Sequence, residues 1–259
     1  MKRFLIPFLT IFLSAGTGSP GERSPYFSPI DLELDQGTDR LFVVGETALE
    51  LRSYALNDLS SYESYFTELP PRALCLAGEK LLIACSHSEG FLLMLDKRTL
   101  EAEAFVRVGH GACDVEVSQD LSTAYVANQF SNDISVVDLN RMEEMGRIKV
   151  IRQPRQISLS ATGKYLFAAN FLPAGRADVD TVTSLVSVID LQDGRTVKHI
   201  SLANGSNALR GMCLSADGKY LLLTHNLGRF QLPTTQLEQG WMNTSALSII
   251  DAISLEYVA

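Results

Sequence analysis

The sequence predicts an all-β fold of the β-propeller type, with about five four-stranded antiparallel blades. Three observations support this prediction. A short apolar strand recurs with a period of about 42 residues over its first four copies, a tight polar turn follows each copy, and no stretch keeps the 3.6-residue periodicity of a helix. Four strands in about 40 to 45 residues are typical of propeller blades, whereas a helical solenoid would require amphipathic helices.

Each unit begins with an apolar strand that we expect to be the innermost of its blade. The five copies are DLEL at 31–34, ALCL at 73–76, DVEV at 114–117, QISL at 156–159 and GMCL at 211–214. Polar turns follow, and the clearest are SATGK at 160–164 and SADGK at 215–219. Such turns are hairpin signals, so each innermost strand should pair with the strand that follows it.

The second strand of each unit is a near-continuous apolar run, which suits a strand covered on both faces. The runs are LFVV at 41–44, LLIA at 81–84, AYVAN at 124–128, YLFAAN at 165–170 and YLLLTH at 220–225. A third strand ends in aspartate in four units, at Asp96, Asp138, Asp190 and Asp251. Their shared repeat position favours hydrogen bonds to turn backbone over calcium binding. A weaker fourth strand, such as GRIKV at 146–150, closes the unit.

Residues 1–18 have the order of a secretory signal peptide. Lys2 and Arg3 precede an apolar run that ends at Leu13, and small residues follow. The run contains Pro7 and is too short for a membrane span, so we expect no span after signal cleavage. We expect residues 19–28 to be a linker, residues 29–259 to form the propeller, and the protein to be periplasmic or extracellular, at the cell surface.

Composition and motifs argue against several classes of function. The formal charge is −8 and basic residues do not cluster, which argues against nucleic acid as a partner. The four cysteines lie in or beside apolar strand-like runs at irregular spacings, so we predict buried free thiols. They are Cys75, Cys85, Cys113 and Cys213. Haem-attachment, paired zinc, G-x-S-x-G and H-E-x-x-H motifs are absent, so no cofactor, metal or catalytic residue is predicted.

The segment YVAN at 125–128, followed by SNDISVVDL at 131–139, resembles the YVTN repeat of surface-layer and YncE-like seven-bladed propellers. The resemblance covers most of the chain after about Pro29. It implies a seven-bladed ring, so the five visible units lead us to expect a truncated chain that ends in the fifth blade. A five-bladed ring closed by the segment near 26–30 is the alternative. The family includes binding and scaffold proteins, so the resemblance implies an architecture rather than one activity.

Strand directions predict where a binding surface lies. Because the strands alternate, the second-to-third loops and the blade connections share one end, which we call the top face. Two long loops are expected there, between Asn170 and Leu185 and from about Asn226 to Ala246. Loops on a rigid scaffold are the usual place for recognition, so we expect binding on this face.

Polar residues of the top face are the candidate ligand contacts. Arg155 and Arg210 occupy equivalent places before innermost strands and are suited to a carboxylate or phosphate. The predicted ligand-binding set is Arg155, Arg210, His225, Arg229, His110 and Asn207. The histidines share no short ligand spacing, so unrelated polar loop residues are the alternative to a histidine site.

An apolar loop at 228–243 is a second candidate surface. Phe230, Trp241 and Met242 are predicted to dock a partner protein, the alternative being a loop folded back on its own blade. The sequence therefore favours an exported, non-enzymatic binding or scaffold module with an unknown protein or small ligand on its top face. The alternative is the propeller of a periplasmic, cytochrome-associated redox enzyme or of a lactone-hydrolysing enzyme.

Overall fold

The computed structural model describes residues 26–229 and 242–259, and all regular structure in these ranges is β. Blade 1 contains β1 (Pro29–Asp35), β2 (Arg40–Gly45), β3 (Glu50–Ala55) and β4 (Asp58–Phe66). Blade 2 contains β5 (Pro71–Ala77), β6 (Lys80–Cys85), β7 (Phe91–Asp96) and β8 (Ala102–Arg107). Blade 3 contains β9 (Ala112–Val117), β10 (Thr123–Asn128), β11 (Asp133–Asp138) and β12 (Glu143–Lys149). Blade 4 contains β13 (Pro154–Leu159), β14 (Tyr165–Asn170), β15 (Leu185–Asp190) and β16 (Arg195–Ser201). Blade 5 contains β17 (Ser206–Leu214), β18 (Tyr220–Gly228), β19 (Asn243–Asp251) and β20 (Glu256–Tyr257).

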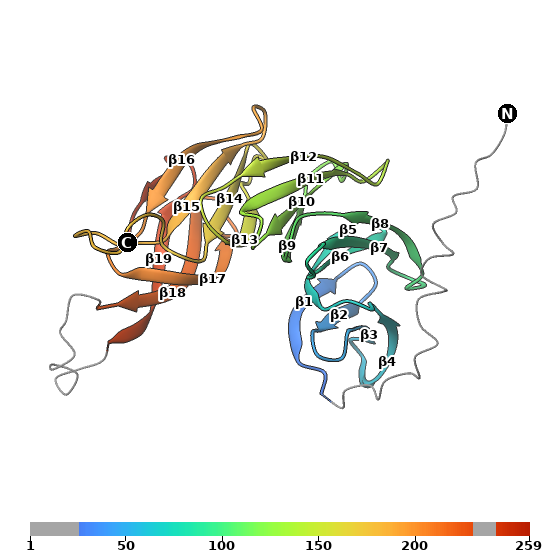
Figure 1. Cartoon of the computed structure of the whole chain (residues 1–259). Coiled ribbons are helices and arrows are strands. Elements are labelled where there is room, and N and C mark those ends of the chain that lie inside the picture. Colours follow the sequence, from blue (N-terminus) through green and yellow to red (C-terminus); the bar gives the residue numbers. More distant parts are fainter. Residues whose placement is uncertain (1–25, 230–241) are drawn as a thin grey trace.

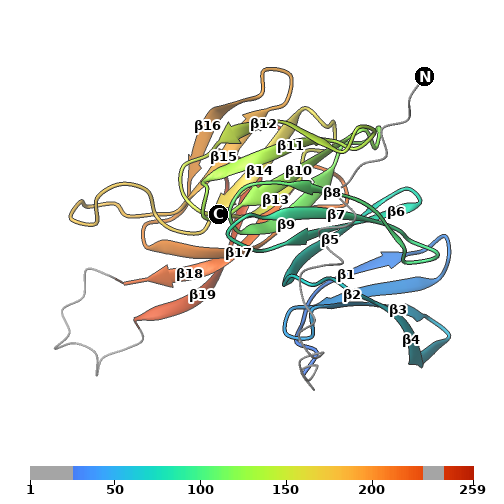
Figure 2. The same ribbon diagram turned by 45° about the vertical axis from the view of Figure 1, so that its right-hand side comes forward.

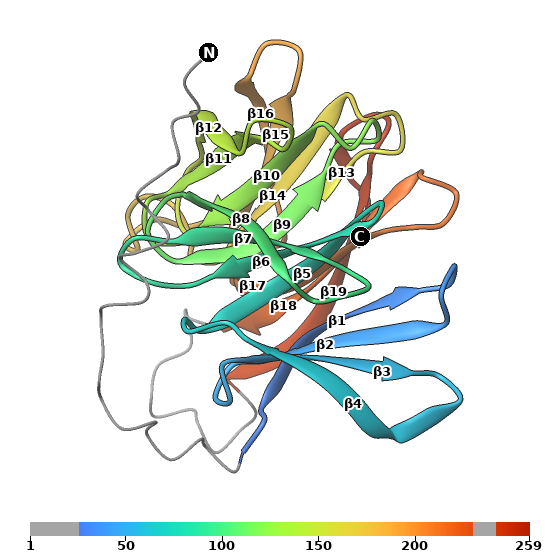
Figure 3. The same cartoon turned by 90° about the vertical axis from the view of Figure 1, so that its right-hand side faces the viewer.

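Each blade is one four-stranded antiparallel sheet whose strands pair in chain order, which confirms the predicted fold class. The blades follow one another around an arc, from β1 to β19 in Figure 1. Views turned by 45° and 90° show the twist of each sheet (Figures 2 and 3). The inner strands β1, β5, β9, β13 and β17 contact one another in that order. They form the face that lines the axis of the arc.

The second strands are the most buried part of blades 1 to 4, as their apolar runs predict, whereas in blade 5 the first and second strands are buried to a similar extent. In β6, β10 and β14 the last five residues are all buried. Phe42 on β2 and Phe167 on β14 are among the largest fully buried side chains. Burying an apolar side chain of this size stabilises a fold by roughly 1.5 to 3 kcal/mol. The packed blades are therefore rigid supports for the loops at their ends.

Aspartates close the turns after the third strands, as predicted. The Asp138 carboxylate accepts hydrogen bonds from the backbone N–H groups of Asn140, at 2.8 Å, and Arg141, at 3.0 Å. The Asp251 carboxylate accepts two such bonds of 2.8 Å, from Ile253 and Ser254. Asp96 and Asp190 make the same kind of contact in their turns.

A polar side chain joins each of three blades to the next. The first residue of the DLEL, DVEV and QISL segments reaches a backbone N–H group on the following inner strand. Asp31 accepts from Leu74 at 2.8 Å, Asp114 from Ile157 at 2.6 Å, and Gln156 from Met212 at 2.7 Å. We call these three contacts the blade clasps. Blade 2 has Ala73 at this position and so lacks the acceptor.

The cysteines are all free thiols in the structure, but one part of the prediction is wrong. Cys75 lies opposite Leu82, not Cys85, because the tight turn between β5 and β6 sets that register. Cys85 and Cys113 are buried, whereas Cys213 is exposed.

The long loop of blade 5 is shorter than the sequence predicts. β18 extends to Gly228 and β19 begins at Asn243, because Asn226 pairs with Ser245 and Gly228 with Asn243. The loop between them is therefore 229–242, shorter than the predicted span. The loop of blade 4 has its predicted length, since β14 ends at Asn170 and β15 begins at Leu185.

Candidate functional site

Three arginines occupy the same position on three inner strands at the top face. Arg72 on β5, Arg155 on β13 and Arg210 on β17 each directly precede the repeated apolar segment. We call them the arginine set. The sequence analysis selected Arg155 and Arg210 and missed Arg72. The 42-residue period alone would have found it, because Arg72 precedes ALCL as Arg155 precedes QISL.

Each arginine reaches back to the residue that follows the second strand of the preceding blade. Arg72 forms an ion pair with Glu46 of blade 1. Arg155 donates from Nη1 to Oε1 of Gln129 on blade 3, at 3.2 Å. The Arg210 guanidinium lies 5.4 Å from the ring centroid of Phe171 on blade 4. The repeat geometry thus places the three guanidinium groups over equivalent blade junctions.

The arginine set carries unbalanced positive charge. Burial lowers the pKa of Arg155, and the positive charges of Arg72 and Arg210 lower it further, while the charge of Glu46 acts in the opposite direction. Glu46 balances Arg72, whereas neither Arg155 nor Arg210 forms an ion pair within the described ranges. A bound anion would relieve this repulsion, and the planar guanidinium groups suit carboxylate or phosphate oxygens.

His225, a predicted ligand contact, is buried in blade 5 with only 5% of its surface exposed. Its Nε2 lies 3.0 Å from the Ser248 hydroxyl, and its Nδ1 lies 3.1 Å from the Asn226 carbonyl oxygen. Asn128 and Asn170 fill the same position in blades 3 and 4. Each likewise bonds a third-strand serine, Ser135 or Ser187. These contacts give His225 a packing role within its own sheet.

The other predicted ligand residues make contacts within their own or neighbouring loops and strand ends. His110 is exposed and its ring lies 5.0 Å from that of Phe130. The Asn207 amide donates to the Gly205 carbonyl oxygen at 2.9 Å. Arg229 begins the loop of blade 5, where its backbone N–H donates to the Met242 carbonyl oxygen at 2.8 Å.

Of the predicted partner-docking residues, Met242 is described, with 40% of its surface exposed. Phe230 and Trp241 lie outside the described residues, as do the predicted signal peptide and most of the predicted linker. The docking prediction for this loop therefore remains a prediction.

Four carboxyl groups lie on the inner strands below the arginine set. They belong to Asp31 and Glu33 on β1 and to Asp114 and Glu116 on β9. Burial raises the pKa of each group, most strongly for Asp114. We call these four groups the carboxyl band. The axial face thus carries positive charge at its top end and protonatable carboxyl groups below it.

Within 26–229 and 242–259, no group of three or more histidine, cysteine or carboxylate side chains has the geometry to hold a metal ion. The same part of the chain contains no helix long and apolar enough to cross a bilayer.

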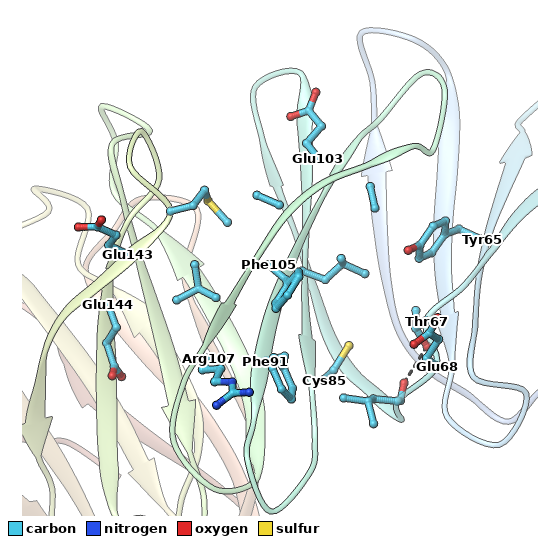
Figure 4. A pocket seen from close by; sticks show the side chains of 16 residues that line it. Tyr65, Thr67, Glu68, Cys85, Phe91, Glu103, Phe105, Arg107, Glu143 and Glu144 are labelled. Atoms are coloured by element: carbon cyan, nitrogen blue, oxygen red, sulfur yellow. Dashed lines mark hydrogen bonds between the residues drawn. The ribbon is translucent and has the colours of Figure 1, made fainter. Parts of the chain in front are cut away.

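A groove of about 1140 Å³ lies at the outer edge of blade 2, around β8 (Figure 4). Aromatic side chains line it, including Tyr65, Phe91 and Phe105, whose rings are labelled in Figure 4. The Cys85 thiol also lines it, and burial raises the pKa of that thiol to about 12. No inner strand contributes to the lining, so the groove is separate from the arginine set.

Comparison with known proteins supports the propeller architecture. Residues 84–172 match the family described as lactonase, 7-bladed beta-propeller. Hydrazine synthase subunit beta of Kuenenia stuttgartiensis is 34% identical over 124 residues, which are 46% of this chain and 30% of that protein. The chain therefore spans less than a third of the length of this curated relative.

Two solved structures have the same fold. Kuenenia stuttgartiensis hydrazine synthase superposes with a TM-score of 0.79 and 23% identity, covering 92% of this chain and 67% of that chain. Dihydro-heme d1 dehydrogenase NirN in complex with DHE superposes with a TM-score of 0.63 and 16% identity, covering 88% of this chain and 46% of that chain. At these identities the likeness concerns the fold alone.

Proposed function

We propose that this chain is a propeller binding module that holds an anionic group at its top face through Arg72, Arg155 and Arg210. The observation that carries the proposal is the placement of three arginines at one repeat position, two of them without an ion pair in the described part of the chain. A structural arginine is normally balanced by a carboxylate. Here the neighbours of Arg155 and Arg210 are an amide and an aromatic ring.

The proposal extends to the setting of the module. The N-terminal sequence supports export to the periplasm or cell surface, and the repeat supports a YVTN-type, non-enzymatic propeller. The ligand is a small molecule or a protein segment that presents carboxylate or phosphate oxygens. Since the arginines sit on rigid inner strands, binding such a group orders their side chains but not the backbone that carries them.

The test is a calorimetric titration of the chain with citrate and with inorganic phosphate at low ionic strength. We expect saturable binding that Arg155→Ala and Arg210→Ala each weaken about tenfold, since a charge-assisted hydrogen bond contributes roughly 1.5 to 3 kcal/mol. Arg72→Ala should have a smaller effect, because Glu46 already neutralises Arg72.

A matched control separates this site from general surface charge. Arg195 lies at the start of β16, at the end of the blade opposite the top face, and pairs with Asp193. Arg195→Ala removes the same charge, and Lys164→Ala removes another from a short turn at that end. Equal losses of affinity in these controls and in the top-face variants would contradict the proposal.

A second candidate function is the propeller of an enzyme subunit. The observation that favours it is the 34% identity over 124 residues with hydrazine synthase subunit beta. Its test is purification of the full-length protein from its source under native conditions, followed by visible absorption spectroscopy. A haem Soret band in the purified assembly would favour this function, and a colourless, monomeric protein would count against it.

A further inference from the structure

The groove beside blade 2 occupies a place where other repeats form a polar network. In blade 3 the Asn128 amide donates to Asp133 at 2.9 Å and to Ser135 at 2.8 Å. Blade 4 repeats the contact between Asn170 and Ser187, at 3.0 Å. Strand register gives the equivalent residues of blade 2, which are apolar: Cys85, Phe91 and Leu93. The apolar lining is therefore particular to blade 2 and is not imposed by the repeat.

The outer strand of blade 2 continues this apolar surface. Phe105 on β8 lies opposite Leu93 in the register of the sheet, and its ring meets that of Phe91 edge to face, with centroids 6.0 Å apart. The corresponding residues of β12 and β16 are Arg147 and His199. Phe105 is 41% exposed, so an aromatic ring stands at the surface where the neighbouring blades carry a charged or polar side chain.

Tyr65 forms the wall of the groove on the side of blade 1. It takes the position that Val106, Ile148 and Ile200 take on the fourth strands of the next three blades. Those three side chains are buried in the cores between blades, whereas Tyr65 is only half-buried. β8 contacts β12 and β12 contacts β16, but no contact of similar extent joins β4 to β8 within the described ranges. The outer edge of the junction between blades 1 and 2 is therefore open.

Carboxylates surround the aromatic rings. The charged residues of the lining are Glu68, Glu103, Glu143, Glu144 and Arg107. Three of these, Glu103, Glu144 and Arg107, form ion pairs with residues outside the lining. Neither Glu68 nor Glu143 forms an ion pair in the part of the chain that the structure describes, and both are exposed. Figure 4 shows them on opposite sides of Phe91 and Phe105, so the groove has negative charge at both of its sides.

We propose that this groove binds an extended basic segment of a partner protein, with lysine or arginine side chains over the rings of Tyr65, Phe91 and Phe105. Aromatic faces attract cations, the aliphatic stems of these side chains pack on apolar surface, and the charged ends reach Glu68 and Glu143. The formal charge of −8 on the whole chain favours a basic partner as well. This site is separate from the arginine set and selects ligands of the opposite charge.

The dimensions of the groove favour a peptide over a metabolite. Every residue of β8 lines it, so the groove follows that strand along its whole length. Its volume of about 1140 Å³ exceeds the range of roughly 300 to 1000 Å³ that is common for small-molecule sites. Several residues of an extended chain fill such a groove, with alternate side chains directed into it.

The test is fluorescence anisotropy with a labelled peptide that alternates lysine and leucine over six residues, the length of β8. We expect saturable binding that Phe105→Ala weakens about tenfold, because it removes a ring that contacts the cation. Glu68→Gln and Glu143→Gln should each weaken binding about threefold, as expected for the loss of one exposed charge pair. These two variants change exposed side chains, so they provide the test if Phe105→Ala does not fold.

Matched controls separate the groove from general surface properties. Phe130→Ala removes another aromatic ring, 51% exposed at the top face, and Asp39→Asn removes an exposed carboxylate from the turn between β1 and β2. Both should bind the peptide like the wild type. Losses of affinity in these controls equal to those in the groove variants would overturn the proposal, as would the absence of saturable binding.

Two further ligands test the chemistry of the occupant. A peptide of the same length that alternates glutamate and leucine should not bind, because it would bring like charges to Glu68 and Glu143. Choline should displace the lysine peptide only at concentrations at least about a hundredfold higher, since it fills a small part of the groove. Binding of the glutamate peptide with equal affinity would overturn the proposal. Displacement by choline at equal concentration would also overturn it and would identify a small-cation site.

Discussion

At the scale of single residues, close packing explains why certain positions accept no larger side chain. Gly109, in the connection between blades 2 and 3, lies against the fully buried Asn128. A Cβ added at Gly109 would stand 2.5 Å from Cγ of Asn128. Asn128 cannot move aside, because its Nδ2 donates to Asp133 at 2.9 Å and to Ser135 at 2.8 Å.

Gly109→Ala should therefore destabilise the fold, by roughly 1 to 3 kcal/mol as for other overpacked sites. Urea denaturation followed by circular dichroism measures the change. Gly146→Ala is the matched control, since a Cβ at Gly146 would meet nothing within 4 Å. Equal free energies of unfolding for the two variants would contradict this explanation.

Cysteine reactivity should differ sharply among the four thiols. Cys213 is exposed, whereas burial raises the pKa of Cys75, Cys85 and Cys113, the last two to about 12. Because the thiolate is the reactive form, the buried thiols should react slowly at neutral pH. A thiol reagent should label one group quickly in the native chain and four after denaturation without a reductant. Rapid labelling that survives Cys213→Ser would show that the assignment to Cys213 is wrong.

At the scale of elements, the blade clasps link one inner strand to the next. The clasp of Asp114 has the shortest bond, 2.6 Å to the Ile157 N–H group. Apolar side chains pack without a preferred direction. The hydrogen bond therefore fixes the position of one inner strand along the next. Blade 2 has no clasp. Its contact with blade 3 is apolar instead, since Ala73 and Ala77 belong to the hydrophobic cluster that the two blades share.

Asp114→Ala should cost about 1 to 3 kcal/mol, because it leaves the Ile157 N–H group without its acceptor. Thermal unfolding at about pH 7 measures the loss. Asp114→Asn keeps an acceptor oxygen and should recover most of the stability. If the alanine and asparagine variants are equally stable, the clasp is not the source of the effect.

At the scale of the whole molecule, the outward faces of the first and last blades expose apolar side chains. Leu32 and Leu34 on β1 are 60% and 41% exposed, and Leu247 on β19 is 58% exposed. Apolar surface of this kind favours association with other molecules. Sedimentation velocity should show self-association of the 259-residue chain that increases with concentration.

The double substitution Leu32→Ser and Leu247→Ser should reduce that association without unfolding the blades. Leu121→Ser, at a tight turn where 46% of the leucine is exposed, is the matched control. Sedimentation that is concentration-independent in the wild type, or unchanged in the double variant, would contradict the prediction.

The sequence by itself determined the strands, their antiparallel order and the face on which long loops project. These features depend on local physics: the two-residue alternation of strands, turn chemistry and a regular period. The same reasoning identified the turn aspartates and two of the three arginines. Comparing the residue before the repeated apolar segment in every unit would have identified Arg72 as well.

Tertiary structure decided which residues meet. His225 is buried against Ser248, Cys213 is exposed, and Glu116 is desolvated by the strands packed around it, which raises its pKa. None of this follows from local pattern, because the tilt and spacing of packed blades set burial and proximity between residues far apart in the chain. Charge repulsion and desolvation then act at those distances, so the pKa of Glu116 is a property of the assembled blades and not of the segment DVEV.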